Sequence, residues 1–170
     1  MGGRMEKDTV SIEELGVLVL RVNGLAKSQP RPRLANGHVV SIADKGAKIW
    51  RERVRTSARC ALVERYGYRF GGVSGAIRVD MVFSFATKDA KRIGEYHTNK
   101  PDKDNLEKMV LDGLEGGGLF AVGDQQVVVG EVSKVWCASG DEGVVIVVSS
   151  PRKKNPRTDT NRGEGEGLGW

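Results

Sequence analysis

Residues 76–85 read Ala-Ile-Arg-Val-Asp-Met-Val-Phe-Ser-Phe. An apolar residue occupies every second position from Ile77 to Phe85, which is the period of a β-strand that buries one face. Further along, apolar residues from Asp104 to about Leu114 recur at the three- and four-residue intervals of a helix. A second strongly apolar strand pattern begins at Val127. A strand, a helix and another strand in succession indicate a sheet packed against helices.

The pattern extends in both directions from this stretch. We expect further elements as a strand over Val17–Val22, a short strand over His38–Ile42, a helix from Asp44 to about Tyr66, and strands over Val127–Trp136 and Val144–Val148 joined as a hairpin around residues 140–143. The chain is therefore predicted to be a single α+β domain, a small mixed sheet with two main helices in the order β-β-α-β-α-β-β. That domain should span residues 15–150, between a flexible leader (1–14) and a disordered basic, Gly-rich tail (151–170).

Charge is distributed unevenly over the 170 residues. The chain has 27 Lys plus Arg and 22 Asp plus Glu, a net charge of +5. Residues 16–85 carry 13 basic and 4 acidic side chains, whereas residues 86–150 carry 7 basic and 11 acidic ones. The first part therefore indicates a surface that faces phosphates, and the second contains an acidic cluster. An ordinary solvated face is the alternative for the basic part.

The two cysteines and the apolar runs of the sequence indicate the compartment in which the protein works. Cys60 and Cys137 lie in apolar segments without zinc-ligand spacing, so we expect buried thiols in a reducing compartment. The longest apolar run near the N-terminus, Val17–Leu20, is too short to cross a membrane. We expect a cytoplasmic protein without a membrane segment.

The acidic cluster lies in Lys-Pro-Asp-Lys-Asp-Asn-Leu-Glu-Lys, residues 100–108, with Asp124 further on. Asp104 alone reads as a helix N-cap, Asp124 alone as a turn residue, and Lys108 as an exposed ion-pair partner of Asp104. Asp102 has no such structural duty in this interpretation. Together, Asp102, Asp104 and Asp124 would repel one another unless a hard cation neutralised them. Oxygen ligands without histidine or cysteine favour Mg²⁺, with Mn²⁺ as a substitute.

These residues resemble the RusA family of Holliday junction resolvases. The resemblance is carried by Asp102-x-Asp104-Asn105-Leu106-x-Lys108, Asp112-x-Leu114, Asp124-x-Gln126-Val127 and the proline- and arginine-rich Pro30-Arg31-Pro32-Arg33. It covers roughly residues 17–149. The chain departs from the family at Gly123, where members commonly have a second aspartate beside the one at Asp124.

The resemblance implies an Mg²⁺-dependent endodeoxyribonuclease acting in DNA recombination and repair. Asp102, Asp104 and Asp124 would be the essential metal-site carboxylates, and Lys108 the essential basic residue. The family is homodimeric, so two active sites would make paired symmetrical nicks across a four-way junction.

Cations near the motifs are candidate DNA contacts. We expect phosphate contacts from Lys27, Arg31 and Arg33 in the loop after the first strand, and from Lys100 and Lys103 beside the acidic pair. Two alternatives stay open from the sequence: a non-catalytic protein that binds branched DNA, and a nuclease of the same fold that cuts flaps or forks.

Overall fold

The computed structural model describes residues 8–28, 33–35, 38–40 and 45–152. Its centre is a five-stranded mixed sheet whose middle strand is β6 (Ile77–Ala86). On one side, β9 (Gly143–Ser149) pairs antiparallel with β6 and with β2 (Leu18–Asn23). On the other side, β7 (Val127–Val129) and β8 (Val132–Cys137) pair parallel with successive parts of β6. The expected α+β class with a mixed sheet is confirmed.

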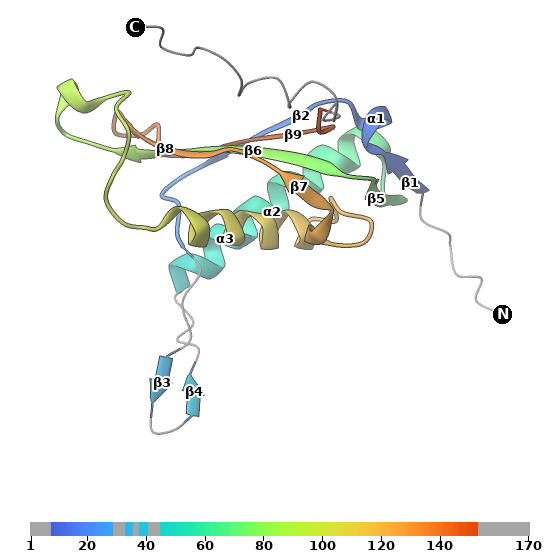
Figure 1. The fold of residues 1–170 in the computed structure, drawn as a ribbon, viewed down its shortest axis with the longest axis horizontal. Coiled ribbons are helices and arrows are strands. Elements are labelled where there is room, and N and C mark those ends of the chain that lie inside the picture. The colour runs from blue at the N-terminus through green and yellow to red at the C-terminus, as the bar shows by residue number, and fades with distance from the viewer. Residues whose placement is uncertain (1–7, 29–32, 36–37, 41–44, 153–170) are drawn as a thin grey trace, which may run out of the picture.

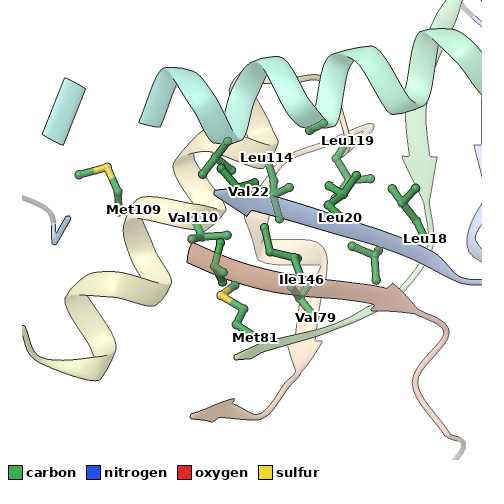
Figure 2. Packing of buried hydrophobic residues seen from close by; sticks show 14 of the residues in the cluster. Leu18, Leu20, Val22, Val79, Met81, Met109, Val110, Leu114, Leu119 and Ile146 are labelled. Carbon is green, nitrogen blue, oxygen red and sulfur yellow. The ribbon is translucent and has the colours of Figure 1, made fainter. Parts of the chain in front are cut away.

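Two helices, α2 (Lys45–Tyr66) and α3 (Lys103–Gly116), cover one face of this sheet (Figure 1). The alternation along β6 decides which face they cover, because its odd-numbered residues from 77 to 85 are all buried. Figure 2 shows Met81 of β6 and Ile146 of β9 packed with Val110 of α3. The hydrophobic core therefore lies between the sheet and the two predicted helices.

Glycines on α3 allow the two helices to approach closely. A Cβ atom added at Gly113 would lie 2.7 Å from Cβ of Val54, and one added at Gly117 would lie 2.8 Å from Cβ of Ala58. Both distances are shorter than real side-chain contacts, so only glycine fits at these positions. This close contact lies at the C-terminal end of α3, away from its start at Lys103.

The flexible leader predicted over residues 1–14 is wrong from residue 8 onward. Strand β1 (Asp8–Ser11) pairs parallel with β5 (Phe70–Ser74), and the one-turn helix α1 (Ile12–Leu15) follows it directly. Ser11 and Glu14 form a reciprocal capping box, and the apolar side chains of Ile12 and Leu15 are buried. Residues 1–7 lie outside the described residues, as do residues 153–170 of the predicted tail.

The predicted hairpin around residues 140–143 is also wrong. Strands β8 and β9 lie on opposite edges of β6, so neither pairs with the other. Strand β5 was not expected, because its sequence, Phe-Gly-Gly-Val-Ser, resembles a glycine-rich turn. Its pairing partner β1 lies about sixty residues earlier in the chain, and no local pattern indicates that pairing.

Like β1 and β5, strands β3 (Arg33–Ala35) and β4 (His38–Val40) form a two-stranded sheet of their own; they pair antiparallel, away from the main sheet (Figure 1). On α2, Cys60 is exposed rather than buried, because the core-facing stripe of the helix runs through Ala58 and Leu62. Cys137 is partly buried and is also a free thiol. Within the described residues, no helix is long and apolar enough to cross a membrane.

Candidate active site

The two carboxylates Asp102 and Asp104 lie at the N-terminal end of α3, and both residues are exposed. Asp102, not Asp104 as predicted, is the N-cap residue, and its side chain makes no capping hydrogen bond to the first turn. Asp104 lies inside the first turn, where the helix dipole favours a negative charge. The helix start thus presents two carboxylates to solvent.

Lys108 lies one turn further along α3. Its Nζ atom is 3.8 Å from Oδ1 of Asp112, and 59% of its side chain remains exposed. The Asp112 side chain is 23% exposed, and an i,i+4 ion pair on a helix surface contributes only about 0.3–0.5 kcal/mol to stability. Lys108 can therefore leave Asp112 for a phosphate at little cost.

Lysines also flank the two carboxylates. Lys100 and Lys103 are exposed on either side of Asp102, while Lys27 is partly buried after β2. Arg33 begins β3, and Arg31 lies outside the described residues. The helix start therefore alternates cations with the acidic pair.

Asp124 lies near the opposite end of α3. It begins the short 3₁₀ helix η2 (Asp124–Gln126). Glu115, near the end of α3, is close to the preceding residue, because a Cβ added at Gly123 would lie 3.2 Å from its Oε1 atom. Asp104 and Glu115 are eleven residues apart, which corresponds to about 16 Å along a helix axis. Figure 1 shows η2's neighbour β7 at the end of α3 that is remote from its start.

The glutamine of the Asp124-x-Gln126 motif holds η2 in this place. Its Nε2 atom donates to the carbonyl oxygens of Val73 (3.0 Å) and Gly75 (2.9 Å), and its Oε1 atom accepts from the amide of Val122 (2.9 Å). These bonds tie η2 to the turn between β5 and β6. Gln126 is therefore a structural residue of the motif, which the sequence did not distinguish from a functional one.

The backbone conformation at Gly123 explains why a glycine replaces the second aspartate that is common in the family. Its φ of 143° lies in a region that residues with a side chain rarely adopt. Its Cβ position is also crowded by the side chains of Gln125 and Glu115. A second acidic residue would not fit the turn in this conformation.

The structure thus brings Asp102, Asp104 and Lys108 to one end of α3 and places Asp124 at the other. Among the residues that the structure describes, no three acidic, histidine or cysteine side chains gather closely enough to hold a metal ion. In the described chain, Asp124 thus lies apart from the other two carboxylates of the metal site expected from the sequence.

The sequence model of the endodeoxyribonuclease RusA family matches residues 23–149, which include both ends of α3. The chain belongs to the RusA endodeoxyribonuclease family. As a RusA endodeoxyribonuclease it is a hydrolase of phosphodiester bonds, and RusA-family nucleases are metal-dependent. A search of curated proteins found no match to the chain.

The residues that match the RusA model include all of the motif residues from Asp102 to Val127. The boundaries of the match run from the last residue of β2 to the last of β9, and they leave out β1 and α1. Lys134 on β8 lies within these boundaries, and it donates hydrogen bonds to the backbone just before Asp102. In the sequence it resembles an ordinary exposed lysine of a strand. No sequence signal distinguished it.

Proposed function

We propose that the protein resolves four-way DNA junctions by paired symmetrical nicks in the cytoplasm of a bacterial host, with Mg²⁺ as the metal and Mn²⁺ as its substitute. The observation that carries this proposal is the exposed pair Asp102 and Asp104 at the start of α3, with the exposed Lys108 one turn away, in a RusA-family chain. Exposed carboxylates flanked by lysines suit a reaction on a polyanion, because the lysines hold phosphates beside the reacting groups.

We assign separate roles to the residues at the helix start. Asp102 and Asp104 would be two of the carboxylate ligands, since hard divalent cations prefer such oxygens. Lys108 would neutralise charge that develops on the scissile phosphate, a role that its exposed ammonium group and its weak pairing with Asp112 support. Asp124 would be the third carboxylate.

A second copy of the chain would bring Asp124 to the other two carboxylates. In a two-fold dimer whose α3 helices lie side by side and antiparallel, the start of one helix meets the end of the other. The partner's Asp124 would then complete the site begun by Asp102 and Asp104. Two such composite sites per dimer match the two symmetrical cuts of junction resolution.

The surroundings of Asp124 support a subunit interface there. Val122 is 75% exposed, Val128 is 61% exposed and Val129 is 40% exposed. Val128 and Val129 belong to β7, which lies at an edge of the sheet. Exposed valines on a sheet edge invite pairing with another chain, and natural proteins rarely leave such an edge uncovered.

We propose that DNA phosphates contact Lys27, Arg31, Arg33, Lys100 and Lys103. Phosphate contacts of this kind position a duplex without reading its sequence, and they make affinity depend strongly on salt. Selectivity for a branched substrate would then come from the spacing of the two sites in the dimer.

Cleavage of a labelled synthetic four-way junction, compared with linear duplex in Mg²⁺ or in EDTA, tests the function. We expect Mg²⁺-dependent paired nicks from the wild type. Asp104→Asn should reduce cleavage by at least about a hundredfold, because it removes a charged ligand oxygen from the reacting centre. It should still bind the junction.

Asp141→Asn is the matched control, because Asp141 is an exposed aspartate in the turn before β9. It should cut as the wild type does. Flap or fork cutting without junction preference would retain the site and change the substrate. Tight junction binding without cutting in Mg²⁺ or Mn²⁺ would contradict the proposal and favour a binding protein.

A further inference from the structure

Lys134 of β8 makes two short hydrogen bonds to the backbone that leads into α3. Its Nζ atom donates to the carbonyl oxygen of Asn99 at 2.7 Å and to that of Pro101 at 2.8 Å. An ammonium group carries three donors, so two of them are used on one short segment. Charge-assisted hydrogen bonds of this length are among the stronger ones in proteins.

The hydrogen bonds to Pro101 matter because this residue immediately precedes Asp102 and the start of α3. Asp102 follows Pro101 directly, and the carbonyl of Asp102 accepts the first helical hydrogen bond, from the amide of Leu106 at 3.2 Å. The place of Pro101 therefore sets the place of Asp102 and the direction in which α3 starts. Lys134 acts on both carboxylates through the backbone.

Lys134 is itself held rigidly by the main sheet. In the parallel pairing of β8 with β6, it lies opposite Phe83, which is fully buried. Its own carbonyl accepts the amide of His97 at 2.9 Å, and the amide of Trp136 donates to Glu95 at 2.9 Å. The segment before α3 is thus attached to the outer edge of β8 through its backbone, and Lys134 extends that attachment to Pro101.

We propose that Lys134 is a positioning residue for the carboxylate pair Asp102 and Asp104, an inference that rests on the proposed metal-dependent cleavage at that pair. Metal ligands must be held within about half an ångström of their productive geometry, and supporting hydrogen bonds provide that restraint. Lys134 binds carbonyl oxygens rather than a carboxylate. Its role is therefore to fix the backbone of the site.

The test compares Lys134→Met with Lys91→Met in the full chain. Methionine keeps the length of the lysine stem and removes both hydrogen bonds. Lys91 lies in the 3₁₀ helix η1 (Ala90–Arg92), is exposed, and loses the same charge. Three quantities are measured for each variant: Mn²⁺ affinity by electron paramagnetic resonance without DNA, half-saturating Mg²⁺ in junction cleavage, and junction affinity in EDTA.

We expect Lys134→Met to weaken Mn²⁺ binding and to raise the half-saturating Mg²⁺ concentration by about tenfold or more, the usual effect of losing support behind metal ligands. Its junction affinity in EDTA and its cleavage rate at saturating Mg²⁺ should stay close to those of Lys91→Met. A general loss of structure would instead weaken Mn²⁺ binding and junction binding together, and it would lower the cleavage rate even at saturating Mg²⁺. Lys134→Gln, with a shorter amide, carries the same test should the methionine variant fail to fold.

Unchanged Mn²⁺ affinity in a folded Lys134 variant would overturn the inference and leave the proposed function standing. A loss confined to junction affinity would also overturn it, because Lys134 would then be a DNA contact. If the wild type neither binds Mn²⁺ nor cuts junctions, that result would instead contradict the proposed function. The two failures are therefore distinguishable.

Discussion

His97 is a buried histidine just before the acidic helix. Its ring lies between those of Phe85 and Trp136, with centroid distances of 4.3 and 4.1 Å, and only 6% of the residue is exposed. Burial lowers the pKa of His97, and the positive charges of Lys134 and Arg92 lower it further. The folded chain therefore keeps this imidazole neutral at pH values where an unfolded chain already protonates it.

We predict that the free energy of unfolding decreases as the pH falls below about 6.5, the usual pKa of histidine. In that range the unfolded state binds a proton that folded His97 does not. The decrease should stop once the pH passes the lowered pKa of the folded state. His97→Phe keeps a ring between Phe85 and Trp136 and removes the titration, so its stability should depend less on pH. Urea unfolding between pH 7.5 and 5 measures this.

His38→Asn is the control for that experiment, because His38 is the other histidine of the chain. It should keep the pH dependence of the wild type. Equal pH dependence in His97→Phe and in the wild type would show that His97 is not the titrating group.

For individual residues, the sequence indicated which side chains lie at the helix start better than it indicated the structural role of each. It singled out Asp102 and Asp104 but assigned the N-cap to Asp104 instead of Asp102. The spacing of apolar residues along a helix does not fix its first residue to within two positions. The sequence did not single out Lys134, whose partners are backbone carbonyls more than thirty residues away. A lysine on a strand normally indicates a solvated position.

At the scale of elements, the contact between α2 and α3 depends on Gly113. We predict that Gly113→Ala destabilises the protein by up to about 2 kcal/mol, since overpacking against Val54 costs about 1–3 kcal/mol and the gain in helix propensity offsets about 1 kcal/mol of it. Chemical denaturation of the two proteins measures the difference. Gly116→Ala should be nearly neutral, because its Cβ would meet only the flexible side chain of Arg55, at 3.4 Å. Equal stabilities of the two variants would contradict this packing.

Elements with strong internal periodicity were predicted correctly. Strand β6 and helices α2 and α3 follow directly from the spacing of their apolar residues. Strand pairing was predicted less well, because the parallel partner of β6 follows a whole helix and β9 inserts between β2 and β6. Only contacts distant in the sequence decide that order.

At the scale of the whole molecule, the two ends of α3 carry different parts of the predicted site. Asp102 and Asp104 lie at its start, and Asp124 lies beyond its end next to the exposed valines of β7. The sequence predicted the acidic residues, but spacing along a chain cannot tell whether they meet within one chain or between two. The proposed two-fold dimer would resolve this separation, and each active site would then take residues from both chains.

Mixing two inactive variants tests whether each active site takes Asp104 from one chain and Asp124 from the other. Asp104→Asn and Asp124→Asn are prepared separately and then refolded together, and nicking of a four-way junction in Mg²⁺ is measured. Random pairing makes about half of the dimers mixed. In a mixed dimer, intact Asp104 of one chain faces intact Asp124 of the other, so one composite site is restored.

We expect each variant alone to be inactive. The mixture should recover about a quarter of the wild-type nicking, as single nicks rather than paired ones, because only one site in each mixed dimer is whole. A mixture as inactive as its components, with mixed dimers demonstrated by tagged-subunit capture, would contradict this arrangement of the active sites. In that case Asp104 and Asp124 would act within one chain.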